Sequence, residues 1–183
     1  MKTILRVPTP NGDVDVNVEI NESEFAKLAA AGFAQKETPT GYERAANYNY
    51  YYYVASDGVA NERIEQKDES DLALYNTANY YSSEVLANNN ARADRLMRQL
   101  RRFAVEHREH EIDWKDLDQS KWSIGFEYNH NTLYTYDKLC SRVFGVTYFD
   151  SKETAQAAID AFYDELIWYF TEYKDNLWGY YER

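Results

Sequence analysis

The sequence contains little cysteine and no long hydrophobic run. Cys140 is its single cysteine, which excludes an internal disulfide framework and suits a reducing compartment. The longest wholly apolar stretch of the C-terminal region, residues 166–170, is far too short to cross a bilayer. The first ten residues lack the apolar core of a secretory signal. These absences predict a cytoplasmic protein that does not associate with membranes.

Glycine is also scarce, and catalytic motifs are missing. The chain has 7 glycines and contains neither a glycine-rich phosphate loop nor a G-x-S-x-G motif. Cys140 lacks the local signature of a nucleophile. Acidic pairs such as Asp116 with Asp118 are too common in an acidic chain to mark general acid–base chemistry. We therefore expect a protein that is not an enzyme.

The composition is that of a folded, acidic protein. Hydrophobic residues make up 44% of the 183 residues and aromatic residues 16%, too many for a disordered chain. The 31 Asp and Glu outnumber the 20 Lys and Arg, giving a formal net charge of -11. Such a charge repels nucleic acid and anionic membranes and attracts basic surfaces. The expected partner is therefore a basic protein, and direct binding of nucleic acid is not expected.

Residues 1–36 predict a small ββα unit. Apolar residues alternate with polar ones over residues 3–7 and again over residues 14–20, as in half-buried antiparallel strands. The intervening residues 8–12 contain the prolines and glycine of a turn. Asn21, with Glu24 three residues later, has the spacing of a capping box at the start of a helix.

Residues 42–183 predict the main α+β domain. We expect strands over residues 48–54, 59–64, 122–128 and 144–149, and helices over residues 83–109 and from residue 151 onward. Residues 65–71 are polar and predict a loop. The fold class expected for the whole chain is α+β, with antiparallel strands packed against helices.

An internal similarity divides this main domain. Residues 80–87 align with residues 148–155, since both contain an aromatic pair, a capping residue (a serine in the first, Asp150 or Ser151 in the second) and the start of a helix. Strands are expected before both segments. The main domain should therefore contain two similar strand–helix units.

A row of arginines lies on the long predicted helix. Arg92, Arg95, Arg98 and Arg102 are spaced by three, three and four residues, so they form one ridge. One interpretation is a site for phosphate or for an acidic protein partner. The other is a solvated face that pairs with the protein's own excess of carboxylates.

Two histidines near the end of that helix suggest an alternative. His107 and His110 are three residues apart, as in some metal sites, and His130 could approach from the next strand. The spacing is not that of an H-E-x-x-H motif, and no cysteine pair accompanies it. A metal-binding protein using His107 and His110 is therefore an alternative, and otherwise no cofactor is expected.

The C-terminal region combines acidic and aromatic residues. Such a mixture offers charges that steer a partner and aromatic side chains that anchor it, although acidic residues can also serve solubility alone. The predicted partner-binding residues are those of the arginine ridge together with Asp160, Asp164, Glu165, Trp168, Glu172 and Tyr173.

Several short strings resemble a family of small, uncharacterised phage and prophage proteins of Gram-positive bacteria. They are residues 40–44, 51–58, 79–84, 100–104, 112–114 and 148–155, and they cover roughly residues 40–165. The sequence departs from that family at Ala78, where glycine is usual. The resemblance implies an origin in a phage or other mobile element.

Small acidic phage proteins often block the nucleic-acid path of a host machine, and anti-CRISPR proteins are one such class. The resemblance therefore implies an inhibitor of a host CRISPR effector nuclease, with type II expected, because such nucleases hold nucleic acid in a positively charged channel. The alternative from the same resemblance is a non-catalytic phage accessory or assembly protein.

Overall fold

The structure, a computed structural model, describes residues 2–9, 12–36 and 40–173 and confirms the α+β class. It divides the chain into two compact units, Met1–Thr40 and Gly41–Arg183. Within the described residues, no helix is both long enough and apolar enough to span a membrane.

The first unit contains one more strand than the sequence predicts. Strand β1 (Lys2–Thr9) pairs on one side with β2 (Gly12–Glu19) and on the other with β3 (Ala34–Lys36), and all pairs are antiparallel. Helix α1 (Glu22–Ala30) begins with the predicted capping box between Asn21 and Glu24. Strand β3 was missed because three residues are too few to show a period of two.

The second unit begins with a hairpin and a short helix. Strand β4 (Tyr50–Val54) pairs with β5 (Ala60–Ile64), as predicted, and α2 (Glu69–Asn76) follows. The prediction of a loop over residues 65–71 is wrong at its end, where Asp68 and Asp71 form a capping box. Helix α2 was missed because its apolar residues do not form a stripe.

The long helix leads to a second hairpin. Helix α3 (Glu84–Glu106) is followed by β6 (Lys121–Glu127) and β7 (Thr132–Lys138), which pair as antiparallel strands. The strand predicted over residues 144–149 is wrong, because only Phe149 pairs there, in a single bridge to Trp122. Residues 144–149 are as apolar as a strand, whereas the true partner β7 is mixed in polarity.

The predicted final helix is two helices. Helix α4 (Lys152–Ala161) ends at Phe162, and α5 (Tyr163–Thr171) begins directly after it. Phe162 has φ -122 and ψ 23, which is not helical, and its ring packs against the core. The apolar pattern continues through this break, which is why the sequence predicts one helix.

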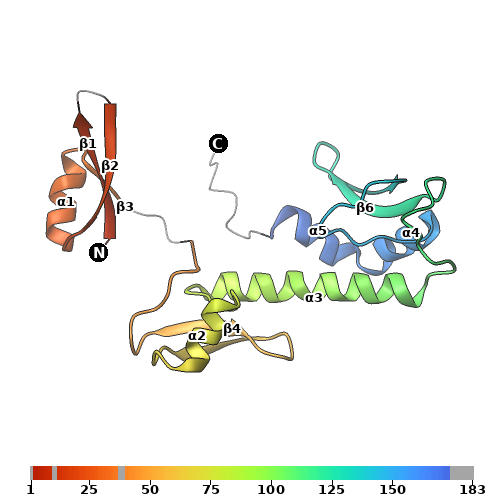
Figure 1. Ribbon diagram of the computed structural model, residues 1–183, viewed down its shortest axis with the longest axis horizontal. Coiled ribbons are helices and arrows are strands. Elements are labelled where there is room, and N and C mark those ends of the chain that lie inside the picture. Colours follow the sequence, from red (N-terminus) through yellow and green to blue (C-terminus); the bar gives the residue numbers. More distant parts are fainter. Residues whose placement is uncertain (1, 10–11, 37–39, 174–183) are drawn as a thin grey trace. The chain divides into compact units, whose positions relative to one another are not determined.

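Helix α3 belongs to two hydrophobic cores, one near each end (Figure 1). Near its start, Leu86 and Ala87 pack with Tyr81 beside the β4–β5 hairpin. Farther along, Leu96 and Leu100 pack with residues of α4 and α5 and against β6. We call residues 41–90 the first module and residues 121–173 the second module.

The two modules repeat one arrangement, as the internal similarity predicts. In the first, Tyr52 and Tyr81 exchange two backbone hydrogen bonds, both 2.8 Å long. In the second, Trp122 and Phe149 exchange two of 2.9 and 2.8 Å. Two residues after each bridge, a serine side chain caps the helix that follows, α3 or α4.

Candidate functional site

Part of the predicted binding surface is an internal contact between α3 and α5. The Arg92 guanidinium bonds both Glu165 oxygens at 2.8 and 3.1 Å and lies over the Trp168 ring, 3.9 Å from its centroid. The arginine holds the pKa of Glu165 below its usual value. The predicted anchor Trp168 is only 7% exposed, so it is a core residue. Tyr173, another predicted residue, donates to Asn90 at 2.6 Å.

The other arginines of the ridge lie in different surroundings from Arg92, although the charge of Arg95 also helps to lower the pKa of Glu165. Arg95 and Arg98 line a polar hollow beside the β4–β5 turn, with Asp57 and Asp94 in its walls. Arg102 lies 3.7 Å from Glu106 in an exposed pair, which contributes little to stability. The four arginines therefore do not share one role, and the charge of Arg92 is neutralised by a partner within the protein.

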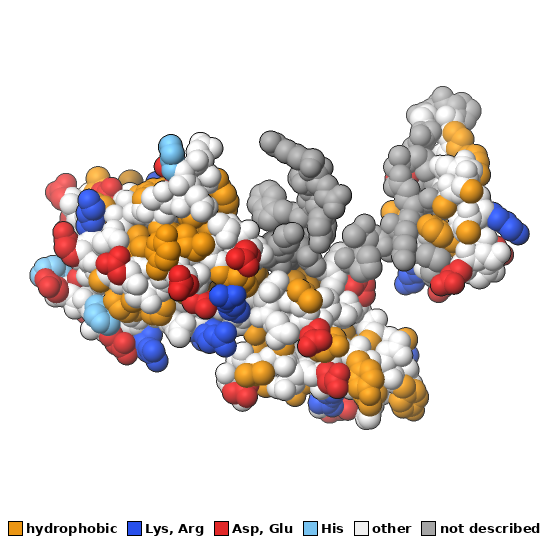
Figure 2. All heavy atoms as spheres, turned by 180° about the vertical axis from the view of Figure 1, so that it is seen from behind, with side chains coloured by type: hydrophobic (Ala, Val, Ile, Leu, Met, Phe, Trp, Pro, Cys, Tyr) orange, Lys and Arg blue, Asp and Glu red, His pale blue; other side chains and the backbone are white. Residues whose placement is uncertain are grey.

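The remaining predicted acidic residues are on the surface of α4 and α5. Asp160, Asp164 and Glu172 are exposed, and within the described part of the chain none of them forms an ion pair. Asp160 accepts a hydrogen bond of 3.0 Å from Gln156. In Figure 2, acidic side chains of the second unit are interspersed with apolar ones.

The structure gives the two helix-end histidines structural contacts. The His107 ring stacks on Phe103 with centroids 3.8 Å apart, and its Nδ1 lies 3.0 Å from the Phe103 carbonyl oxygen. The backbone N–H of His110 donates to the buried Asp150 carboxylate at 3.0 Å. His130 lies beside Glu127 instead. Among the residues that the structure describes, no group of three potential ligands could hold a metal ion.

Sequence reasoning missed a buried polar network in the first module. Glu65, which is fully buried, accepts hydrogen bonds from Arg44 at 3.1 and 3.2 Å and from the Tyr80 hydroxyl at 2.7 Å. The Arg44 bond is the main reason that the pKa of Glu65 is lowered. Burial and the bond to Glu65 raise the pKa of Tyr80 to about 12.

Asp71, in the first turn of α2, continues this network. It is fully buried and accepts hydrogen bonds from the Tyr51 hydroxyl at 2.7 Å and the Gln66 backbone at 2.8 Å, while Arg63 lies at 3.1 Å. Burial alone would raise the pKa of Asp71, but these partners outweigh it and the pKa is lowered. The stacked rings of Tyr51 and Tyr80, 3.9 Å apart, join both halves. Arg44 lies within one of the strings of the resemblance, which was the available signal.

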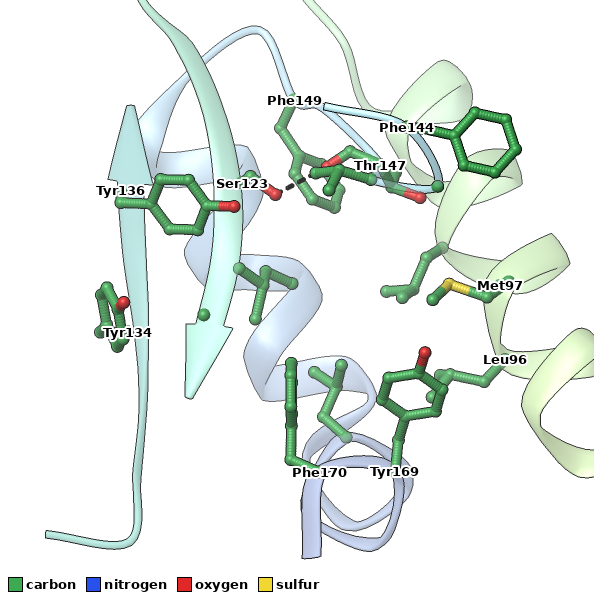
Figure 3. Close-up of a pocket in the computed structure, with 16 residues that line it drawn as sticks. Leu96, Met97, Ser123, Tyr134, Tyr136, Phe144, Thr147, Phe149, Tyr169 and Phe170 are labelled. Atoms are coloured by element: carbon green, nitrogen blue, oxygen red, sulfur yellow. Dashed lines mark hydrogen bonds between the residues drawn. The ribbon is translucent and has the colours of Figure 1, made fainter. Parts of the chain in front are cut away.

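The second module contains an apolar cavity of about 490 Å³ (Figure 3). Leu96 and Met97 of α3 line one side, and Tyr169 and Phe170 of α5 line another. The opposite wall is formed by β6, β7 and the segment 144–149. Its volume is within the usual range for ligand pockets.

Apolar side chains are exposed around this cavity. Phe144, which lines it, is 103% exposed, and Val143, which lines an adjoining hollow, and Tyr134, on β7, are nearly half exposed. The Tyr134 ring covers Gly125, where an added Cβ would lie 2.7 Å from the ring. Clustered apolar exposure of this kind is typical of interaction sites.

Comparisons with known protein families, with curated proteins and with solved structures find no match to this chain. The candidate sites are therefore argued from their own geometry.

Proposed function

We propose that this protein is a non-catalytic inhibitor that binds a basic, nucleic-acid-handling protein of a bacterial host. The observation that carries the proposal is the set of exposed carboxylates Asp160, Asp164 and Glu172, which have no cationic partner among the described residues. A CRISPR effector nuclease, type II in particular, is the partner that the resemblance to phage proteins implies. The activity requires no cofactor.

The helices that carry these carboxylates are firmly held. Arg92 ties α5 to α3 through Glu165 and Trp168, and α4 packs into the larger core through Ala155 and Ile159. Charges on a rigid scaffold lose little conformational entropy when they meet a partner. With a net charge of -11, the protein is also steered toward basic surfaces over distance. A channel that holds a guide duplex and target DNA is such a surface.

The test is a DNA-cleavage assay with purified CRISPR effector nucleases in the presence and absence of the protein. We expect inhibition of at least one type II nuclease. The triple variant D160K/D164K/E172K should weaken that inhibition by about tenfold or more, because rim charges govern association. A matched control, E62K/E69K/E84K, makes the same change in net charge on exposed residues of the first module.

If the control reduces inhibition as much as the triple variant does, inhibition depends on net charge alone. That result would contradict the assigned surface. An absence of inhibition across a representative panel of effectors would contradict the proposed function itself.

A further inference from the structure

Along one edge of strand β6, backbone N–H and C=O groups have no hydrogen-bond partner among the described residues. In an antiparallel strand the backbone N–H and C=O groups of alternate residues point to the same side. The backbone N–H and C=O of Trp122 point to Phe149 and away from β7, because Trp122 and Phe149 exchange two backbone hydrogen bonds. The groups of Ile124, two residues farther on, therefore point to this same outer edge.

The first module closes the equivalent edge with a side chain. There the bridge joins Tyr52 and Tyr81, and Val54 is the residue two positions farther along. The Asn79 side chain accepts from the Val54 N–H at 2.7 Å and donates to its carbonyl at 2.8 Å. Asn79 thereby replaces a paired strand residue. Ala78 before it has φ 55, a left-handed conformation that glycine adopts more readily.

The second module has no such closure. Thr147 stands two residues before Phe149, as Asn79 stands two before Tyr81. Its carbonyl accepts a hydrogen bond of 3.0 Å from the Ser123 hydroxyl (Figure 3). Among the described residues, no hydrogen bond joins its side chain to Ile124. Within residues 40–173, no hydrogen bond to the outward N–H and C=O of Ile124 is formed. Such groups need a partner, either water or another strand.

This open edge lines the apolar cavity. Ile124 and Gly125 form part of its wall, and Phe144 stands fully exposed at the same site. An edge strand beside an apolar pocket is the arrangement that binds extended peptides, with the backbone giving affinity and alternate side chains filling the pocket. The occupant that fits is therefore an added strand.

The charge at the site defines the occupant further. A hollow that shares Met97 and residues 144–147 with the cavity is lined by Arg101 and Arg142, with Asp94 also in its wall. In the described part of the chain, neither arginine forms an ion pair. Two arginines at one site in a protein of net charge -11 favour an acidic group on the ligand.

We propose that the second module binds an extended peptide segment of a partner protein, which pairs with the outer edge of β6. Apolar side chains at alternate positions enter the cavity, and an acidic residue next to them faces Arg101 and Arg142. This site goes beyond the proposed inhibitory function, because its ligand is acidic whereas the nuclease surface is basic.

The experiment titrates the isotope-labelled full chain with short synthetic peptides and follows backbone amide signals by NMR. The probe set is acetyl-Thr-X-Thr-X-Thr-Asp-amide, with X as Val, Ile, Leu or Phe. We expect at least one peptide to shift the Ile124 amide signal and to protect that amide from exchange. The same peptide with N-methylated backbone amides should bind at least tenfold more weakly, because it keeps the side chains but cannot pair as a strand.

A peptide with Asn in place of its Asp should bind more weakly by about three- to tenfold if the arginines receive the charge. If no peptide of the set shifts the Ile124 signal, or if N-methylation leaves affinity unchanged, the proposal is overturned. Cleavage inhibition is a separate readout, so failure here and failure of the proposed function are distinguishable.

A variant of the protein provides an independent check. T147N places asparagine where the first module has Asn79 and should close the edge, while T147S is the matched control. We expect T147N to protect the Ile124 amide in the free protein and to reduce peptide affinity at least tenfold. Unchanged affinity in a T147N protein whose Ile124 amide has become protected would also overturn the proposal.

Discussion

The first and second modules share a hairpin, a single strand bridge and a serine-capped helix, but they are completed differently. In the first, Tyr51 stands before the bridging residue and begins the buried network to Asp71. In the second, Lys121 holds that place, fully buried, and its amine donates to the carbonyls of Asp116 and Leu139. Only the first module has a helix, α2, between its hairpin and its bridge.

The difference concerns where polar groups are satisfied. The first module pairs its buried carboxylates and closes its strand edge with Asn79, so it leaves few groups for a ligand. The second module leaves the Ile124 edge open beside an apolar cavity and an exposed Phe144. One scaffold therefore serves stability at one end of α3 and, we infer, binding at the other.

The largest effect should come from breaking the buried network of the first module. In E65A, Arg44 and the Tyr80 hydroxyl lose the carboxylate that they share. The Tyr80 hydroxyl is then buried without an acceptor for its hydrogen bond. We expect a loss of about 3 kcal/mol in the free energy of unfolding. The measurement is urea denaturation followed by circular dichroism, with E62A as the exposed control, expected to change stability by less than about 0.5 kcal/mol. An equal effect of both variants would contradict the importance of the network.

Acid should affect the first module through the same residues. The folded-state pKa values of Glu65 and Asp71 are lowered, so their stabilising contribution is complete above the unfolded-state value of about 4. It is lost as the pH falls from there through the lowered folded-state values. The free energy of unfolding should therefore fall with pH in this window, and less steeply in E65Q. Parallel pH profiles for wild type and E65Q would contradict this assignment.

A smaller loss of stability is expected when the strand edge at Val54 in the first module is opened, as the edge at Ile124 is in the second. N79A removes both hydrogen bonds to Val54 and should cost about 1–2 kcal/mol. The Val54 amide should then exchange rapidly while Tyr52, bonded to Tyr81, stays protected. N76A, at the end of α2, is the control, because Asn76 is exposed. A protected Val54 amide in N79A would mean that Asn79 does not close the edge.

Sequence patterns predicted the features that depend on neighbouring residues. The capping box at Asn21 and the alternation in β2 and β6 are local signals, and the structure confirms them. Of the capping residues that the sequence left open for the later helices, the structure selects Ser83 and Ser151. The repeat of residues 80–87 and 148–155 also indicated the two modules. Strand β7 and helix α2 were missed because their residues are ordered by distant partners rather than by a periodic pattern.

The candidate sites were less predictable for a related reason. Whether Arg92 faces solvent or Glu165 depends on a contact between residues 73 positions apart in the sequence. The open edge at Ile124 is visible only when the hydrogen bonds of both modules are compared. No pattern in the sequence distinguishes a carbonyl that has a partner from one that lacks it.

The most direct test of the two-module account is amide hydrogen exchange of the free protein at Val54 and Ile124. The bridge residues Tyr52 and Trp122 serve as internal controls, since both donate to a bridging partner and should be protected. We predict that Val54 is protected and that Ile124 exchanges faster, on the order of 100-fold or more. Equal protection of Val54 and Ile124 would contradict the claim that the second module presents an open strand edge.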